Sequence, residues 1–257
     1  MLKKEDHDTI AARLDEAARH AHAVAQISHA FPLTLDDAYA IQALSIDRRI
    51  ARGEQLAGFK MGFTSRAKME QMGVHDMIWG RLTDAMHIPD GGTLHMDRLI
   101  HPRAEPEICF RFDQDVDQAL SVAEVKTCVD AVAPAIEVID SRYEHFKFSL
   151  EDVIADNCSS AAFVVGTWHP ADTPLDHLKI SLAIDEAVVH EGASTAILGD
   201  PWESVAAATR LITGGGVRIP AGCVLMAGAA TPAVYLKRGQ QVAVKIDQLG
   251  GCSFLTQ

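Results

Sequence analysis

The sequence has 257 residues, 48% of them hydrophobic, and a formal net charge of −12. A chain of this length buries a substantial core in one or two domains, and its acidic balance excludes a nucleic-acid-binding protein, because contacts to phosphates require clustered Lys and Arg. The five cysteines are scattered and form no Cys-x-x-Cys pair, so neither a disulfide framework nor a zinc site is indicated.

The beginning of the chain is polar and rich in alanine, and no stretch has the apolar length of a signal core or a membrane span. We therefore expect a soluble protein with no membrane partner. The unpaired cysteines favour a reducing compartment, which predicts a cytoplasmic location.

Two helices are predicted before residue 55. Apolar residues recur every three or four positions over residues 5–29, which predicts an amphipathic helix that Phe31 and Pro32 close. Thr34 and Asp37 have the spacing of a capping box, so a second helix is expected to begin there and to end at Gly53.

Strand patterns dominate the rest of the chain. Residues 56–63 are expected to form a strand, residues 65–72 a short helix, and residues 86–99 a set of turns. Further strands are predicted over residues 105–112, 133–140, 161–166, 178–184, 223–226 and 241–246, and further helices over residues 121–131 and 201–213. This order indicates an α+β fold, with a mainly helical region at residues 1–80 and a mixed, mainly β domain at residues 81–257.

Two glutamates two residues apart stand in the predicted strand at 105–112. Glu105 and Glu107 share one face of the strand, where their mutual repulsion and lost hydration require a cation or a proton. A solvated edge strand is the alternative, because Pro106 is tolerated there. Glu137 adds a third acid to another apolar strand, and three carboxylates suit Mg²⁺ or Mn²⁺.

Polar residues at three further places are candidates for the same site. Lys60 lies between Gly58 and Gly62, which leaves room for a ligand beside the ammonium, although a lysine that reaches solvent at a strand end fits the local sequence as well. The stretches at residues 140–142 and 156–160 follow or precede predicted strands, and each is compatible with an ordinary turn or with the wall of a site.

Four motifs taken together carry a family resemblance. They are residues 58–65 (GFKMGFTS), 101–107 (HPRAEPE), 136–143 (IEVIDSRY) and 155–160 (ADNCSS). In this order they resemble the hydratase/decarboxylase branch of the fumarylacetoacetate hydrolase superfamily, and the likeness runs from about residue 35 to near the end of the chain. It implies that the mainly β region is a fumarylacetoacetate hydrolase-like catalytic domain.

The resemblance also implies an activity and a set of site residues. The activity is metal-dependent decarboxylation of a 2-oxo dicarboxylate, 2-oxo-3-hexenedioate, to 2-hydroxypenta-2,4-dienoate in the meta-cleavage pathway of aromatic catabolism. The implied metal ligands are Glu105, Glu107 and Glu137, the implied catalytic residues are Lys60, Asp140 and Asp156, and the implied substrate contacts are Arg142, Asn157 and Ser160. Burial near a metal is expected to lower the pKa of Lys60 toward neutrality.

Related activities remain as alternatives. Hydratases of the branch carry an aspartate where this chain has Ile78, which favours decarboxylation, although Asp76 is close enough to substitute if the loop shifts. Acylpyruvate hydrolases usually have an aspartate in place of Glu137 and a catalytic His-Glu pair that is not evident here. The resemblance further implies a homo-oligomer and an association with a vinylpyruvate hydratase, in which the chain would be active or a non-catalytic partner subunit.

Overall fold

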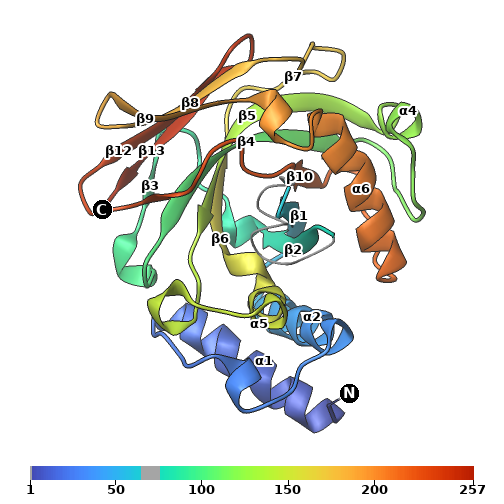
Figure 1. The fold of residues 1–257 in the computed structure, drawn as a ribbon, viewed down its shortest axis with the longest axis vertical. Coiled ribbons are helices and arrows are strands. Elements are labelled where there is room, and N and C mark those ends of the chain that lie inside the picture. The colour runs from blue at the N-terminus through green and yellow to red at the C-terminus, as the bar shows by residue number, and fades with distance from the viewer. Residues whose placement is uncertain (1, 65–75) are drawn as a thin grey trace.

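The computed structural model describes residues 2–64 and 76–257, and it has a helical layer at one end and a mainly β body at the other (Figure 1). The short helix expected over residues 65–72 lies outside the described residues. The α-helices are α1 (Lys4–Arg19), α2 (Leu35–Ala51), α4 (Val122–Val125), α5 (Leu150–Ala155) and α6 (Pro201–Gly214). The 3₁₀ turns are η1 (Ile27–His29), η2 (Asp84–Met86), η3 (Met96–Arg98), η4 (Glu144–Phe146), η5 (Asn157–Ser159) and η6 (Ser194–Ala196).

The larger of two sheets has eight strands, and β4 and β5 form its centre. Its main path follows the order β2, β1, β10, β4, β5, β6, while β11 pairs with β4 and β7 pairs with β5. The strands are β1 (Leu56–Gly62), β2 (Ile78–Thr83), β4 (Arg103–Phe112), β5 (Val129–Ile139), β6 (Ser160–Val165), β7 (His169–Pro170), β10 (Val224–Met226) and β11 (Val234–Tyr235). All neighbours are antiparallel except β1 and β10.

The second sheet has five strands in the order β3, β13, β12, β8, β9. They are β3 (Gly92–Leu94), β8 (Lys179–Ile184), β9 (Ala187–Ala193), β12 (Gln241–Ile246) and β13 (Gly250–Thr256). One continuous apolar core joins this sheet to the larger sheet and to helix α6, and it includes Ile136, Val244 and Val205. The arrangement confirms the α+β expectation. The proposed division between residues 80 and 81 remains a prediction, and β1, which precedes it, hydrogen bonds to β10, which follows it.

Helices α1, α2 and α5 pack on one another around a separate apolar cluster (Figure 1). The capping box expected at the start of α2 is present, because Thr34 Oγ1 accepts from the backbone N–H of Asp37. The Asp37 carboxylate in turn accepts from Thr34 and from the ring of His7 in α1. A second link between α1 and α2 is a two-bond contact from the Arg52 guanidinium to Asp15. The helical layer is thus held by polar contacts as well as by its core.

The helix predicted over residues 5–29 was wrong beyond Arg19. His20 caps α1, and Ala21 has a positive φ of 48°, which takes the chain out of the helix. Val24 then forms a bridge with Tyr143, in which its N–H donates to the carbonyl of Arg142. The apolar residues after Arg19 do have helical spacing, but the bridge between Val24 and Tyr143 outweighs this local preference for a helix.

The helix predicted over residues 121–131 was also wrong in its second half. It ends with α4 at Val125, and β5 begins at Val129, earlier than expected. Val129 and Ala131 are buried in the sheet while Asp130 is exposed, so the strand alternation decides the outcome. No helix in the described part of the chain is long and apolar enough to cross a membrane.

Candidate metal centre

Three glutamates meet at the centre of the larger sheet. Glu105 on β4 lies directly opposite Glu137 on β5, and Glu107 follows two residues later on the same face of β4. One carboxylate oxygen from each of the three lies within 4.8 Å of the other two. Glu107 and Glu137 are completely buried and Glu105 is 8% exposed, which rules out the solvated edge strand considered above.

The electrostatics of this trio are unfavourable without a cation. Burial and the charge of Glu137 raise the pKa of Glu107 well above its usual range. Burial likewise raises the pKa of Glu137, and the ammonium of Lys60 opposes that rise. Glu107 Oε2 accepts a hydrogen bond of 2.7 Å from the backbone N–H of Gly228, whereas its Oε1 is buried and has no hydrogen-bond donor among the described residues. A converging set of carboxylate oxygens with one lacking a donor fits a hard divalent ion.

Lys60 reaches the trio from β1. Its Nζ lies 3.0 Å from Glu137 Oε2 and donates to the carbonyl of Cys158 at 3.2 Å. Burial lowers the pKa of Lys60, but the carboxylates, led by that of Glu137, raise it further, so the net shift is upward. The expected shift toward neutrality is therefore opposite to the one that these contacts produce.

The glycines on either side of Lys60 serve strand packing, and Gly62 also lines the same pocket as Lys60. A Cβ on Gly58 would stand 2.1 Å from the carbonyl oxygen of Val224 on β10, and one on Gly62 would stand 2.9 Å from Ile78 Cγ1 on β2. Both approaches are closer than a side chain permits. The two glycines let β1 lie tightly between its neighbours, which fixes the direction of the lysine.

A turn of unusual backbone conformation, η5, delivers the carbonyl that Lys60 contacts. Asn157, Cys158 and Ser159 have positive φ values of 50°, 52° and 58°. Consecutive residues in this region cost conformational energy and persist only when their surroundings hold them. The Asn157 side chain exchanges two hydrogen bonds with the backbone of Arg81, at 2.7 and 2.8 Å, and the Cys158 thiol contacts the carbonyl of Trp79. Strand β2 thus holds the turn in place.

Ser160 follows this turn and contacts the trio directly. Its hydroxyl donates to Glu137 Oε1 at 3.0 Å, so Lys60 and Ser160 approach the two oxygens of the same carboxylate. The hydroxyl oxygen of Ser159 is buried and has no partner within the described part of the chain. The structure places the Ser160 hydroxyl against a candidate metal ligand, and the expected contact with substrate stays a prediction.

Arg142, Asp140 and Asp156 are engaged with one another and with nearby backbone. The Arg142 guanidinium donates to the Asp156 carboxylate and to the carbonyl oxygens of Asp140, Asp156 and Ser160. The Asp140 carboxylate accepts from the N–H groups of Ile100 and His101. Burial raises the pKa of Asp156 to about 6, while the nearby Arg142 opposes the rise. The structure does not bring Arg142, Asp140, Asp156 or the amide of Asn157 to the pocket of Lys60.

A pocket of about 620 Å³ reaches the trio at Glu105. Its polar lining also includes Lys60, Ser159, Arg103 and Lys147. The apolar lining includes Phe63, Ile78, Ile139, Phe146, Phe148, Val153 and Pro232. The sequence analysis missed Arg103, although the strand period that united Glu105 with Glu107 also places Arg103 on their face of β4.

The two residues that bear on hydration lie in different surroundings. Ile78, the first residue of β2, is buried and lines the pocket of Lys60. Asp76 is exposed and forms a two-bond ion pair with Arg210 of α6, at 2.9 and 3.0 Å. The aspartate that was considered as a substitute is therefore held away from the pocket.

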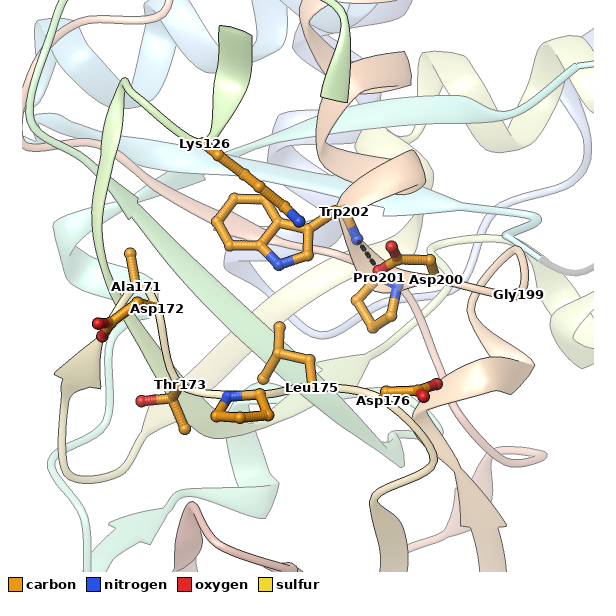
Figure 2. A pocket seen from close by; sticks show the side chains of 11 residues that line it. Lys126, Ala171, Asp172, Thr173, Leu175, Asp176, Gly199, Asp200, Pro201 and Trp202 are labelled. Carbon is orange, nitrogen blue, oxygen red and sulfur yellow. Dashed lines mark hydrogen bonds between the residues drawn. The ribbon is translucent and has the colours of Figure 1, made fainter. Parts of the chain in front are cut away.

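A separate cavity of about 550 Å³ lies between α4, α6 and the loop after β7 (Figure 2). Lys126 lies over the ring of Trp202, with Nζ 5.3 Å from its centroid, and Asp200 accepts from the backbone N–H of Trp202 at the start of α6. These contacts cap and pack the helix. None of the residues lining this cavity belongs to the trio or to the pocket that reaches it.

Comparisons with known proteins find relatives in a single enzyme family. A family profile described as fumarylacetoacetate (FAA) hydrolase C-terminal matches residues 59–254. A 4-oxalocrotonate decarboxylase from Pseudomonas sp is 48% identical over 96% of both chains, and a 2-hydroxyhexa-2,4-dienoate hydratase from Comamonas testosteroni is 32% identical over 98% of both. The solved 4-oxalocrotonate decarboxylase from Pseudomonas putida G7, complexed with magnesium and adipate, superimposes with a TM-score of 0.97 at 37% identity, covering 100% of this chain and 99% of that one.

Proposed function

The chain belongs to the fumarylacetoacetate hydrolase family, and on this basis we propose that it is a divalent-metal-dependent carboxy-lyase. Its reaction is the decarboxylation of 2-oxo-3-hexenedioate to 2-hydroxypenta-2,4-dienoate in aromatic meta-cleavage catabolism. The structural observation that carries the proposal is the buried cluster of Glu105, Glu107 and Glu137 beside Lys60 and next to a pocket that Glu105 lines. The relative that is 48% identical and named for this activity supports the substrate.

The three glutamates are the residues that hold the cation. They offer only oxygen ligands, and Glu107 Oε1 has no other donor among the described residues, which suits Mg²⁺ with Mn²⁺ as the alternative. When bound, the ion supplies Lewis-acid polarisation of the 2-oxo group and offsets the charge of the trio. A magnesium complex of the structural relative supports this assignment.

Lys60 supplies positive charge where the reaction develops negative charge. As the C5–C6 bond breaks, its electron pair moves through the C3=C4 alkene to the oxygen on C2, and CO₂ leaves. The ammonium of Lys60, held 3.0 Å from Glu137 Oε2, stabilises this oxygen and then donates the proton that gives the 2-hydroxydiene. Fixed donors in a buried site lower such a barrier by several kcal/mol.

The other candidate residues act through position. Ser160 orients the carboxylate of Glu137 by the hydrogen bond to Oε1. Arg142 and Asp156 hold the backbone around η5, and Asn157 fastens η5 to β2. Asp140 anchors the chain just before β4 through the N–H groups of two residues. We assign these five a structural role in support of Lys60 and the trio.

Hydration of 2-hydroxypenta-2,4-dienoate is the second candidate function, because hydratases are among the relatives. Ile78 gives an apolar wall where hydratases carry an acid, and the ion pair with Arg210 holds Asp76 elsewhere. Hydrolysis of an acylpyruvate and a non-catalytic role as a partner subunit are less favoured. A homo-oligomer, an association with a vinylpyruvate hydratase and a cytoplasmic location remain part of the proposal.

One experiment separates these functions. The purified protein is incubated with Mg²⁺ and either 2-oxo-3-hexenedioate or 2-hydroxypenta-2,4-dienoate, and CO₂ and organic products are followed by mass spectrometry. We expect CO₂ and 2-hydroxypenta-2,4-dienoate from the first compound, and no turnover once a chelator is present. Formation of 4-hydroxy-2-oxopentanoate from the second compound, without CO₂ from the first, would identify a hydratase instead.

A further inference from the structure

Arg103 occupies the first position of β4, on the same face as Glu105 and Glu107. Its neighbours across the sheet are Ile139 on β5 and Tyr235 on β11. Two residues along a strand correspond to about 6.6 Å. The guanidinium therefore belongs to the same row of side chains as the trio, displaced along the strand within one pocket.

Two aromatic rings fix the orientation of the Arg103 guanidinium plane. Its central carbon lies 3.9 Å from the centroid of the Phe146 ring and 4.1 Å from that of Tyr235, and Nη2 donates to the Tyr235 hydroxyl. Phe146 reaches this position with a positive φ of 58°, a costly conformation for a bulky residue. Two aromatic faces thus fix the plane of the guanidinium group.

The charge of Arg103 has no acidic partner in the described part of the chain. Its Nε is buried and has no hydrogen-bond partner there either. Arg111, further along the same strand, pairs with Asp130, and Arg142 pairs with Asp156. A guanidinium group that is oriented, half-buried and without an acidic partner among the described residues is suited to a carboxylate from outside the chain.

We propose that Arg103 binds the second carboxylate of the substrate, the one remote from the three glutamates, and thereby selects dicarboxylates over monocarboxylates. This inference rests on the proposed function, because it takes the 2-oxo end of the substrate to lie at the trio. A six-carbon dicarboxylate has a length comparable with the separation between Glu105 and Arg103 along β4. The ammonium of Lys147, which lines the same pocket, adds positive potential nearby.

The assignment has a kinetic consequence. The carboxylate held by Arg103 is the group that leaves as neutral CO₂, so its attraction to the guanidinium weakens as the bond breaks. An interaction that is strong with the substrate and weaker in the transition state contributes to KM more than to kcat. Loss of the side chain should therefore raise KM without lowering kcat.

The test compares adipate, a six-carbon dicarboxylate, with hexanoate, its monocarboxylate counterpart. Binding of each to the Mg²⁺-loaded protein is measured by calorimetry for the wild type, Arg103→Gln, Arg103→Lys and the control Arg111→Gln. We expect the wild type and Arg111→Gln to prefer adipate, Arg103→Gln to lose that preference by roughly ten- to hundredfold, and Arg103→Lys to keep part of it. Thermal unfolding and binding of Mg²⁺ alone verify that each variant is folded.

The outcomes distinguish this inference from the proposed function. A wild type that decarboxylates 2-oxo-3-hexenedioate, together with an Arg103→Gln variant that keeps the adipate preference, overturns the role of Arg103 and leaves the function standing. A wild type with no preference for adipate overturns it as well. If the wild type binds Mg²⁺ but releases no CO₂ from the substrate, the proposed function fails, and the assignment of Arg103 fails with it.

Discussion

The ammonium of Lys60 and the carboxylate of Glu137 form a buried ion pair, with Nζ 3.0 Å from Oε2. Glu137 is also one of the three candidate metal ligands, so a lysine and a metal ion would share the charge of one side chain. Rate, metal affinity and stability therefore have to be measured separately to tell a change at the lysine from a change at a ligand.

Glu107→Gln should abolish metal-dependent turnover and leave the fold intact. Burial raises the pKa of the Glu107 carboxyl, which means that the ionised group is unfavourable in the folded protein without a metal. The neutral amide avoids this cost, so the metal-free variant should unfold at a temperature no lower than that of the wild type. Glu186→Gln, on an exposed turn, is the matched control. Activity and thermal unfolding are measured with Mg²⁺ and with chelator, and near-normal turnover by Glu107→Gln would refute its assignment as a ligand.

Mg²⁺ should stabilise the wild type by linkage. At a free concentration one hundred times its Kd, an ion that binds only the folded state adds about 2.7 kcal/mol. Chelation should lower the unfolding temperature and stop the reaction, and added Mg²⁺ should restore both. An unfolding temperature indifferent to Mg²⁺ in the wild type would contradict a site made of the three glutamates.

Lys60→Ala should keep metal binding and lose rate. Removal of a positioned proton donor typically costs about 10²- to 10⁴-fold in turnover, and calorimetry should still detect Mg²⁺ on the variant. Lys245→Ala, an exposed lysine on β12, serves as the control. Wild-type kinetics in Lys60→Ala would remove the lysine from the mechanism.

Ser160→Ala should weaken metal affinity without removing a ligand. The Ser160 hydroxyl fixes one oxygen of Glu137, and loss of such an outer contact commonly costs about 10- to 100-fold in metal affinity or activity. The affinity for Mg²⁺ is compared with that of Ser181→Ala, a serine on β8 with only a long contact of 3.5 Å. Equal affinities in the two variants would show that the contact does not matter.

Asp37 should contribute stability that depends on pH. Burial raises its pKa, but hydrogen bonds from Thr34, His7 and Leu2 lower it more, and the net shift is downward from 3.8. A carboxyl whose pKa is lower in the folded state contributes fully above its unfolded pKa, and the contribution is lost as the pH falls through the folded value. Asp37→Asn should therefore be less stable than the wild type at neutral pH, and denaturant unfolding should show the gap closing in strong acid.

The parts of the site that lie on strands were predictable from the sequence. Glu105, Glu107 and Glu137 interrupt apolar strands with acids, and strand alternation is a local property that survives folding. Alternation also predicts that Lys60 and its two flanking glycines lie on the same face of the strand. The sequence does not show that the neighbouring strands pack closely against these glycines. The pKa of Lys60 shifts upward, opposite to the expectation, because the direction of the shift depends on how many carboxylates the fold gathers around the ammonium.

The loop residues could not be placed in the same way. Arg142 and Asp156 stand in polar stretches that suit substrate contacts equally well, and only the fold shows that they pair with each other. The helix expected through residue 29 failed for a related reason, because a bridge between Val24 and Tyr143 joins parts of the chain that local spacing does not connect. Arg103 was within reach of sequence reasoning, since it continues the row of Glu105 and Glu107.

The pairing of β4 with β5 makes the metal centre a check on the register of the sheet. Glu105 stands opposite Glu137, and the pairs from Arg103–Ile139 to Arg111–Ala131 follow without interruption. A slip of one residue would turn Glu137 to the opposite face and leave two acids without their third. Insertions or deletions within this ladder should thus be far more damaging than exchanges of side chain, and ion binding can report whether a refolded preparation has paired its central strands correctly.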